Sequence, residues 1–173
     1  MNIVSFIRAM TSRNPQPVRT FLPLLLLMSM PAILSAQIDV ILPEVNARPG
    51  AEISIPLKIG ELEGEKVTSF EFVVSCDTNL VQLLGVDQAG TLSEGLTMFA
   101  NNHVAPFGRG RMKVVCASAI PLSGNGVLVK ILALARGRNG KAALKLSDFI
   151  LNAGKPTVET TAGMVMISRP RKK

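Results

Sequence analysis

The side chains best suited to chemistry are few in this chain. Its 173 residues include one histidine, His103, and two cysteines, Cys76 and Cys116. That set is too small for the common zinc sites, which draw four ligands chiefly from cysteine and histidine. The sequence also lacks a Gly-x-Ser-x-Gly turn, which would give His103 a nucleophile to activate. We therefore expect His103 to be a surface or loop residue and not a catalytic base.

The carboxylates form no pattern with a known chemistry. Glu61, Glu63 and Glu65 fall within one short segment, but their spacing is not that of a calcium-binding EF-hand. Glycosidases need two carboxylates facing each other across about 5–10 Å, whereas the acids here are scattered along the chain. The sequence thus predicts no enzyme, no metal site and no cofactor.

The positive charge lies at the two ends of the chain. The formal net charge is +7, but residues 1–36 hold three arginines and residues 168–173 hold four basic residues, which leaves twelve bases against twelve acids in between. Nucleic-acid binding needs a basic face on the folded body and usually aromatic side chains for stacking. The chain has no Trp and no Tyr, so we predict no nucleic-acid partner.

The first 36 residues are typical of an export signal. A basic stretch ends at Arg19, and an apolar run of 16 residues, Phe21–Ala36, contains two prolines and closes on small residues. A membrane-spanning helix needs about 20 apolar residues. We expect cleavage after Ala36 and a secreted or cell-envelope protein. Retention of residues 1–36 as an anchor stays open, and membrane contact is expected only in that case.

After Ala36 the hydrophobic pattern has a period of two, which indicates β-strands. Pro56 lies within one of these segments, which predicts a sheet edge or a bulge there. Residues 37–168 are expected to form one all-β domain, a nine-stranded antiparallel β-sandwich with jelly-roll or immunoglobulin-like topology, followed by a solvated basic tail at 169–173. The expected strands are Gln37–Pro43, Glu52–Ile59, Val67–Cys76, Leu80–Asp87, Met98–Val104, Arg111–Ala119, Val127–Ala135, Ala142–Leu151 and Val158–Ile167.

The order and spacing of several segments resemble those of the cohesin domains. Arg48-Pro-Gly50 followed by Ile53–Leu57 is similar to the turn and second strand of that family. Phe70–Asp77, with its alternating aromatics, resembles the third strand, and Gly126–Ile131 resembles a later one. The chain departs from the family pattern at Cys76 and Thr78, where a tyrosine and a proline are expected.

The resemblance implies a sandwich that binds dockerin modules on one sheet. The contact face would be the outer side of the third strand, with its neighbours on the fifth, sixth and eighth. Carried onto this sequence, the candidate contact residues are Ser69, Glu71, Val73 and Ser75, then Asn101 and His103, then Arg111, Lys113, Val115 and Ala117, and finally Leu122, Ser123 and Gly124 in the following loop.

Val73, Val115 and Ala117 are apolar at positions expected to face water. An apolar patch flanked by charges is a usual composition for a protein interface. The alternative is an ordinary solvated sheet face, since single exposed apolar residues are common.

Cys76 and Cys116 are both expected to point into the core, from strands that are neighbours in the resembled fold. Export would place them in an oxidising compartment, where an even number of cysteines favours a disulfide. Two buried free thiols are the alternative.

The function that we expect is a secreted, non-catalytic cohesin-like module that docks a helical dockerin-type partner. Two other classes stay open. One is a polysaccharide-binding module, against which the missing Trp and Tyr argue. The other is a structural cell-surface subunit that assembles through strand edges.

Overall fold

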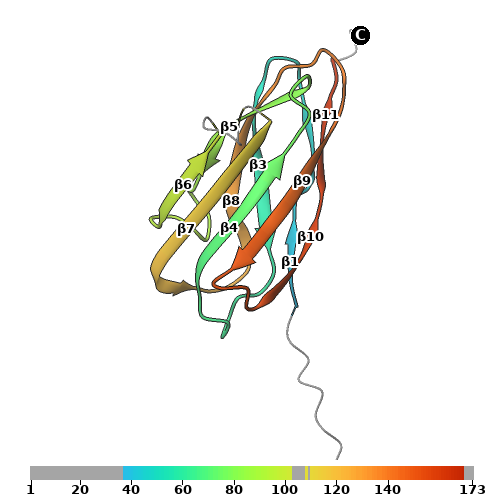
Figure 1. Ribbon diagram of the computed structural model, residues 1–173. Helices are drawn as coiled ribbons and strands as arrows, with labels where there is room; N and C mark the ends of the chain where they lie inside the picture. Colours follow the sequence, from blue (N-terminus) through green and yellow to red (C-terminus); the bar gives the residue numbers. More distant parts are fainter. Residues whose placement is uncertain (1–36, 103–107, 109, 170–173) are drawn as a thin grey trace, which may run out of the picture. The chain divides into compact units, whose positions relative to one another are not determined.

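The computed structural model describes residues 37–102, 108 and 110–169, and these form two β-sheets packed face to face (Figure 1). The five-stranded sheet has the order β10–β1–β3–β8–β5, with β10 at Thr157–Thr161, β1 at Gln37–Ile41, β3 at Glu52–Ile59, β8 at Gly126–Ala135 and β5 at Val81–Asp87. The six-stranded sheet has the order β2–β11–β9–β4–β7–β6, with β2 at Glu44–Ala47, β11 at Gly163–Ile167, β9 at Gly140–Leu151, β4 at Val67–Ser75, β7 at Arg111–Leu122 and β6 at Thr97–Asn101. Within these residues no helix is long and apolar enough to cross a membrane.

The all-β sandwich is confirmed, with eleven strands in the described part of the chain where nine were expected. The difference arises at the two ends of the fold, because an unexpected strand in the other sheet follows the first expected strand, and the last expected strand is divided between the two sheets. Residues 37–47 form β1 and then β2, and residues 157–167 form β10 and then β11. Alternation shows which side chains face the core but not which sheet a strand joins, so this crossing was not predicted.

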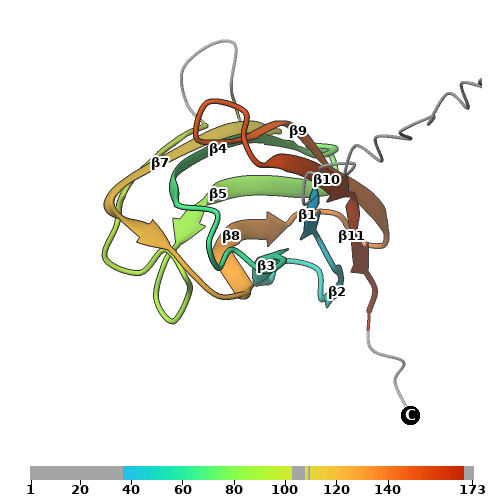
Figure 2. The same ribbon diagram turned by 90° about the horizontal axis from the view of Figure 1, so that it is seen from below.

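The first and last segments run parallel, so the expectation of a purely antiparallel sandwich is wrong for these pairs. Gln37 pairs with Thr157 at the start of the β1–β10 pair, and Glu44 pairs with Met164 in β2–β11 with the same sequence offset. The two segments therefore change sheets together, and all four strands lie at one side of the sandwich (Figure 2).

Gly163 lies at this crossing because no side chain fits there. A Cβ atom on Gly163 would lie 2.7 Å from the Cβ of Leu42 and 2.7 Å from the carbonyl oxygen of Pro43. The Leu42 N–H donates to the Thr161 carbonyl at 3.1 Å, which holds the two segments together at this point. A side chain at position 163 would separate them.

The core lies between the sheets and follows the predicted alternation. Phe70, Phe72 and Val74 of β4 are buried on its inner side. The Phe72 ring stacks on Phe70 and on Phe149, with centroid separations of 6.3 and 5.5 Å. Burying side chains of this size stabilises a fold by about 1.5–3 kcal/mol each. This packing determines which side of β4 faces the core and leaves its other side on the outer surface of the sheet.

The predicted irregularity at Pro56 is confirmed. The register between β3 and β8 shifts between Leu57 and Lys58. On the other side of β3, β1 pairs only with Lys58 and Ile59. Pro56 therefore interrupts no hydrogen bond between β1 and β3.

Candidate docking face

Most of the predicted contact residues lie together on the outer face of β9, β4, β7 and β6. Strand β4 turns Ser69, Glu71, Val73 and Ser75 outward, because Phe70, Phe72 and Val74 occupy the core. Strand β7 turns its alternate residues to the same side, because Met112, Val114 and Cys116 are buried. In the β4–β7 register Glu71 is opposite Val115, Val73 opposite Lys113, and Ser75 opposite Arg111. The four strands lie side by side in Figure 1.

A row of mainly apolar side chains crosses all four strands. Phe99 of β6 is opposite Val115, Val115 is opposite Glu71, and Glu71 is opposite Ile150 of β9. Phe99 is 72% exposed and Val115 is 38% exposed. With strands about 4.8 Å apart, the row is about 14 Å long. Exposed apolar side chains aligned in this way are characteristic of the centre of a protein interface.

Phe99 was missed at the level of the sequence, although a signal for it was present. The predicted strand Met98–Val104 included it, and Asn101 and His103 were chosen as outward positions. The same period of two places Phe99 on that face, as its pairing with Val115 shows. Asn101 is on the face, opposite Lys113, whereas His103 lies outside the described residues.

An ion pair and further basic residues flank the row. The Lys113 ammonium lies 3.0 Å from a carboxylate oxygen of Glu71, and both side chains are about one-third exposed. A pair with this exposure contributes little to stability. Arg111 and Lys145 lie on either side of Ser75, near the end of the face. The row therefore has a basic border on one side.

A hollow of about 450 Å³ opens next to the row, and Asn152 positions its wall. The hollow is lined by Ser69, Glu71, Val115, Ile150 and Asn152, among others. The Asn152 side-chain oxygen accepts hydrogen bonds from the Thr68 and Ser69 N–H groups at 2.9 and 3.3 Å. Asn152 has φ +47°, a conformation that asparagine tolerates better than most residues. Sequence patterns did not single it out, because its partners are more than 80 positions away.

Two predicted contact residues, Val73 and Leu122, differ in environment from the expectation, whereas Ser123 and Gly124 lie in the loop as expected. Val73 is only 3% exposed, since it lies mid-sheet between Lys113 and Ser147. Leu122 is buried in the core, so it is not part of the loop. Gly124 accepts a hydrogen bond from the Leu62 N–H, so with Ser123 it belongs to the turn after β7. Ala117 is exposed, as expected.

The disulfide expectation is wrong, since Cys76 and Cys116 are both free. Their strands are neighbours, but Cys116 is opposite Phe70, and Cys76 lies six residues further along the chain, beyond the end of β4. Six residues of strand span about 20 Å, whereas a disulfide needs Cα atoms within about 7 Å. Burial raises the pKa of each thiol to about 11, with a smaller contribution from the charge of Asp77 at Cys76. The Cys76 thiol donates to the Val81 carbonyl at 3.3 Å.

No family model and no curated protein matches this chain, but solved structures do. A non-cellulosomal cohesin from the hyperthermophilic archaeon Archaeoglobus fulgidus is 24% identical, with a TM-score of 0.62 over 76% of this chain and 91% of that one. The seventh ScaB type I cohesin from Pseudobacteroides cellulosolvens is 16% identical, with a TM-score of 0.63 over 79% and 95%. A type I cohesin–dockerin complex from Clostridium thermocellum gives 20% identity and a TM-score of 0.62 over 76% and 99%.

The fold is that of the cohesins. The resemblance inferred from the sequence is thereby confirmed at the level of the fold. The expected third, fifth, sixth and eighth strands correspond to β4, β6, β7 and β9, and they are adjacent in one sheet. The cohesin fold therefore brings the candidate residues of these four strands onto one continuous surface.

Proposed function

We propose that this chain is a non-catalytic docking module that binds an α-helical, dockerin-like segment of a partner on the β9–β4–β7–β6 face. The observation that carries the proposal is the row of Phe99, Val115 and Ile150 on the outside of a sheet whose inner side is already filled by the core. The cohesin fold supports it, because a structural neighbour was solved in complex with a dockerin.

The dimensions of the row fit a helix. A helix rises 1.5 Å per residue, so about nine residues would cover the 14 Å between Phe99 and Ile150. Apolar side chains spaced three, four and seven residues apart would then meet the row. Arg111 and Lys145 at the border favour acidic residues on one flank of that helix. The partner segment is thus amphipathic and acidic along one side.

Polysaccharide binding has less support. Sugar-binding surfaces usually present several flat aromatic rings, whereas Phe99 is the one largely exposed ring among the described residues. A single phenyl group suits an apolar pocket on a protein partner better, because such anchors lie at the centre of protein interfaces.

Export is part of the proposal and rests on the composition of residues 1–36. The basic start, the short apolar run and the small residues before Gln37 support a cleaved signal. The protein would then act outside the cell or in its envelope. Intact-mass measurement of the protein recovered from the source organism tests this, and a mass that includes residues 1–36 would contradict cleavage.

The docking proposal is tested by capture of partners on the full chain, followed by titration of the purified partner. Phe99→Asp places a charge in the row and is expected to weaken binding roughly thirtyfold or more. Ile41→Asp is the matched control, because Ile41 is a 42% exposed apolar residue on β1 of the other sheet. Equal affinity of the two variants, or capture of polysaccharide without protein, would contradict the proposal.

A further inference from the structure

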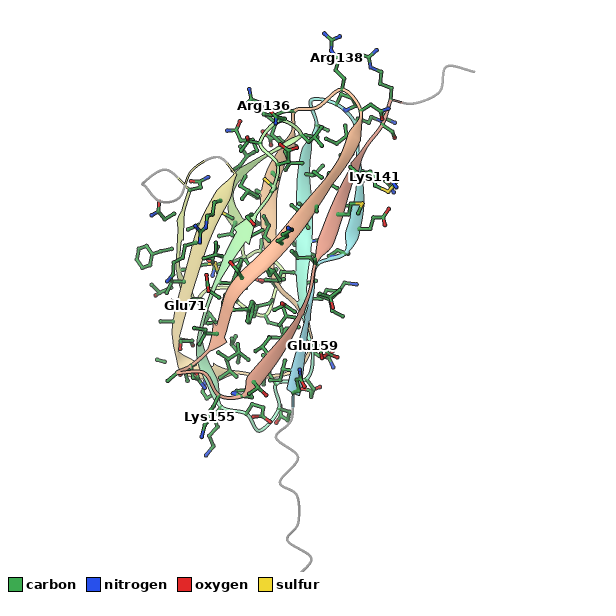
Figure 3. All side chains as sticks on the ribbon, turned by 45° about the vertical axis from the view of Figure 1, so that its right-hand side comes forward. Glu71, Arg136, Arg138, Lys141, Lys155 and Glu159 are labelled. Carbon is green, nitrogen blue, oxygen red and sulfur yellow. The ribbon has the colours of Figure 1, made fainter. Side chains whose placement is uncertain are left out.

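The two ends of the sandwich differ in their balance of charged residues. Basic residues gather where the β2–β3 and β8–β9 turns meet the end of β11. Figure 3 shows Arg136, Arg138 and Lys141 towards this end, with Lys155 and Glu159 towards the other. The segments are held together, because Gly50 N–H donates to Ala135 O at 2.7 Å and Ser168 N–H donates to Ala47 O at 3.1 Å. The basic end consists of Arg48, Arg136, Arg138, Lys141 and Arg169.

The opposite end carries acids together with Lys66 and Lys155. The turn that follows β3 holds Glu61, Glu63 and Glu65, and Glu159 lies on β10 near Gln37, whose side chain donates to it at 3.1 Å. Four of the five cations of the basic end belong to the segment that holds equal numbers of acids and bases, and Arg169 comes from the basic C-terminal stretch. Arg136, Arg138 and Lys141 are close in sequence, and strand pairing brings Arg48 and Arg169 to the same end.

A hollow of about 470 Å³ opens at the basic end. It is lined by Arg138, Asn139, Ser168 and Arg169. Within the described residues, no carboxylate forms an ion pair with either arginine. Glu52 and Asp77, the acids of the adjoining segments, pair with none of the five cations. The hollow is thus lined by two arginines that have no ion-pair partner among the described residues.

We propose that this hollow binds a phosphate group. Guanidinium groups donate two parallel hydrogen bonds to oxyanions, and such charge-assisted bonds are stronger than neutral ones. A carboxylate offers two oxygens, which one arginine can occupy alone, whereas a phosphate offers three or four. The amide of Asn139 and the hydroxyl of Ser168 supply further donors to these oxygens. Lys141 and Arg136 add positive potential around the hollow.

Backbone hydrogen bonds and close packing hold the two segments that carry these donors. The N–H groups of Arg136 and Gly137 both donate to the Leu80 carbonyl, at 2.7 and 3.1 Å. Gly137 is buried against Leu80, where a Cβ atom would lie 2.5 Å from a Leu80 methyl group. On the other side, Ile167 pairs with Gly140, which places Ser168 and Arg169 beside the β8–β9 turn. The site is thus built from two segments that the sheet aligns.

Two sources could present this chemistry, a free phosphate ion and a phospholipid headgroup, and two titrations separate them. The full chain is titrated with inorganic phosphate and followed by the amide NMR signals of Asn139, Gly140 and Ser168. It is also sedimented with vesicles of phosphatidylglycerol and phosphatidylcholine. The double variant Arg138→Gln/Arg169→Gln removes the two guanidinium groups, and Lys66→Gln/Lys155→Gln removes the same charge near the other end.

We expect saturable binding of phosphate. The R138Q/R169Q variant is expected to lower the affinity for phosphate at least about tenfold, whereas K66Q/K155Q is expected to change it less than about twofold. Vesicle binding that R138Q/R169Q weakens and K66Q/K155Q does not would identify the lipid headgroup as the source of the phosphate. Phosphate binding without vesicle binding would identify the free ion. An equal loss of phosphate affinity in the two double variants would mean that binding depends only on the net charge of the protein, and would overturn the proposal. Absence of any shift with phosphate at low salt would also overturn it. Because this site lies away from the β9–β4–β7–β6 face, partner docking is expected to survive R138Q/R169Q.

Discussion

Individual side chains on the β9–β4–β7–β6 face are expected to contribute to binding in two ways, through burial of apolar surface and through charge. Phe99 projects into solvent from an edge strand, so its burial on binding would release the most apolar surface. Glu71 and Lys113 form an exposed ion pair beside it. Such a pair adds little to the stability of the free protein, but across an interface it governs which partner charges are accepted.

Reversing the charges of this pair tests that role. Glu71→Lys and Lys113→Glu are each expected to weaken partner binding, because each places two like charges side by side. The double exchange should recover part of the loss. The free energy of unfolding, measured by urea titration, should change by less than about 1 kcal/mol in every variant. A double variant as weak as the worse single one would show that the pair does not act as a unit.

The two thiols give a pH-dependent prediction. Burial raises the pKa of Cys76 and of Cys116 from about 9 to about 11 in the folded protein. At pH 8 the thiolate fraction is therefore about a hundredfold lower than in the unfolded chain. Alkylation by iodoacetamide, followed by mass, should be slow in the native protein and fast in concentrated urea. Detection of a Cys76–Cys116 disulfide would contradict the register of β4 and β7.

The same shift affects stability. A thiol with a raised folded pKa favours folding below pH 9, and that contribution is lost as the pH rises towards 11. The free energy of unfolding should thus fall over this range. The Cys76→Ala/Cys116→Ala variant is the control, since it lacks only the two thiols. A variant whose stability falls as steeply as that of the wild type would contradict the assignment to the thiols.

At the scale of elements, sequence periodicity predicted where the strands lie but not how they pair. Glu52–Ile59 was located to the residue, and the inward side chains of β4 were identified correctly. Register depends on contacts between residues far apart in the chain, so the separation of Cys76 and Cys116 along the paired strands could not be predicted. The crossing of the first and last segments between sheets depends on the whole sandwich, so it left no local signal.

The crossing itself can be tested at Gly163. Gly163→Ala would place a methyl group 2.7 Å from Leu42 and Pro43, which is expected to cost about 1–3 kcal/mol of stability. Gly85→Ala is the matched control, because a Cβ atom there meets nothing within 4 Å. Thermal unfolding followed by circular dichroism compares the two. Equal stability of the variants would show that the two segments do not approach each other as described.

At the scale of the whole molecule, the sandwich carries two separate surfaces. The β9–β4–β7–β6 face runs along the side of the sheet, and the basic end lies at the β2–β3 and β8–β9 turns. The sequence predicted the residues of the face through the cohesin resemblance, but it described the body between the charged termini as neutral. Arg136, Arg138 and Lys141 are close in sequence, but the addition of Arg48 and Arg169 to them becomes visible only when the strand pairing is known. A partner bound to the face would leave the basic end free.

The most direct test of the central claim is to map the docked surface on the full chain. Amide NMR signals are recorded with and without the purified partner. We expect the largest shifts on Phe99, Glu71, Lys113, Val115 and Ile150, with little change on the five-stranded sheet. Shifts concentrated on β3, β8 and β5 would contradict it.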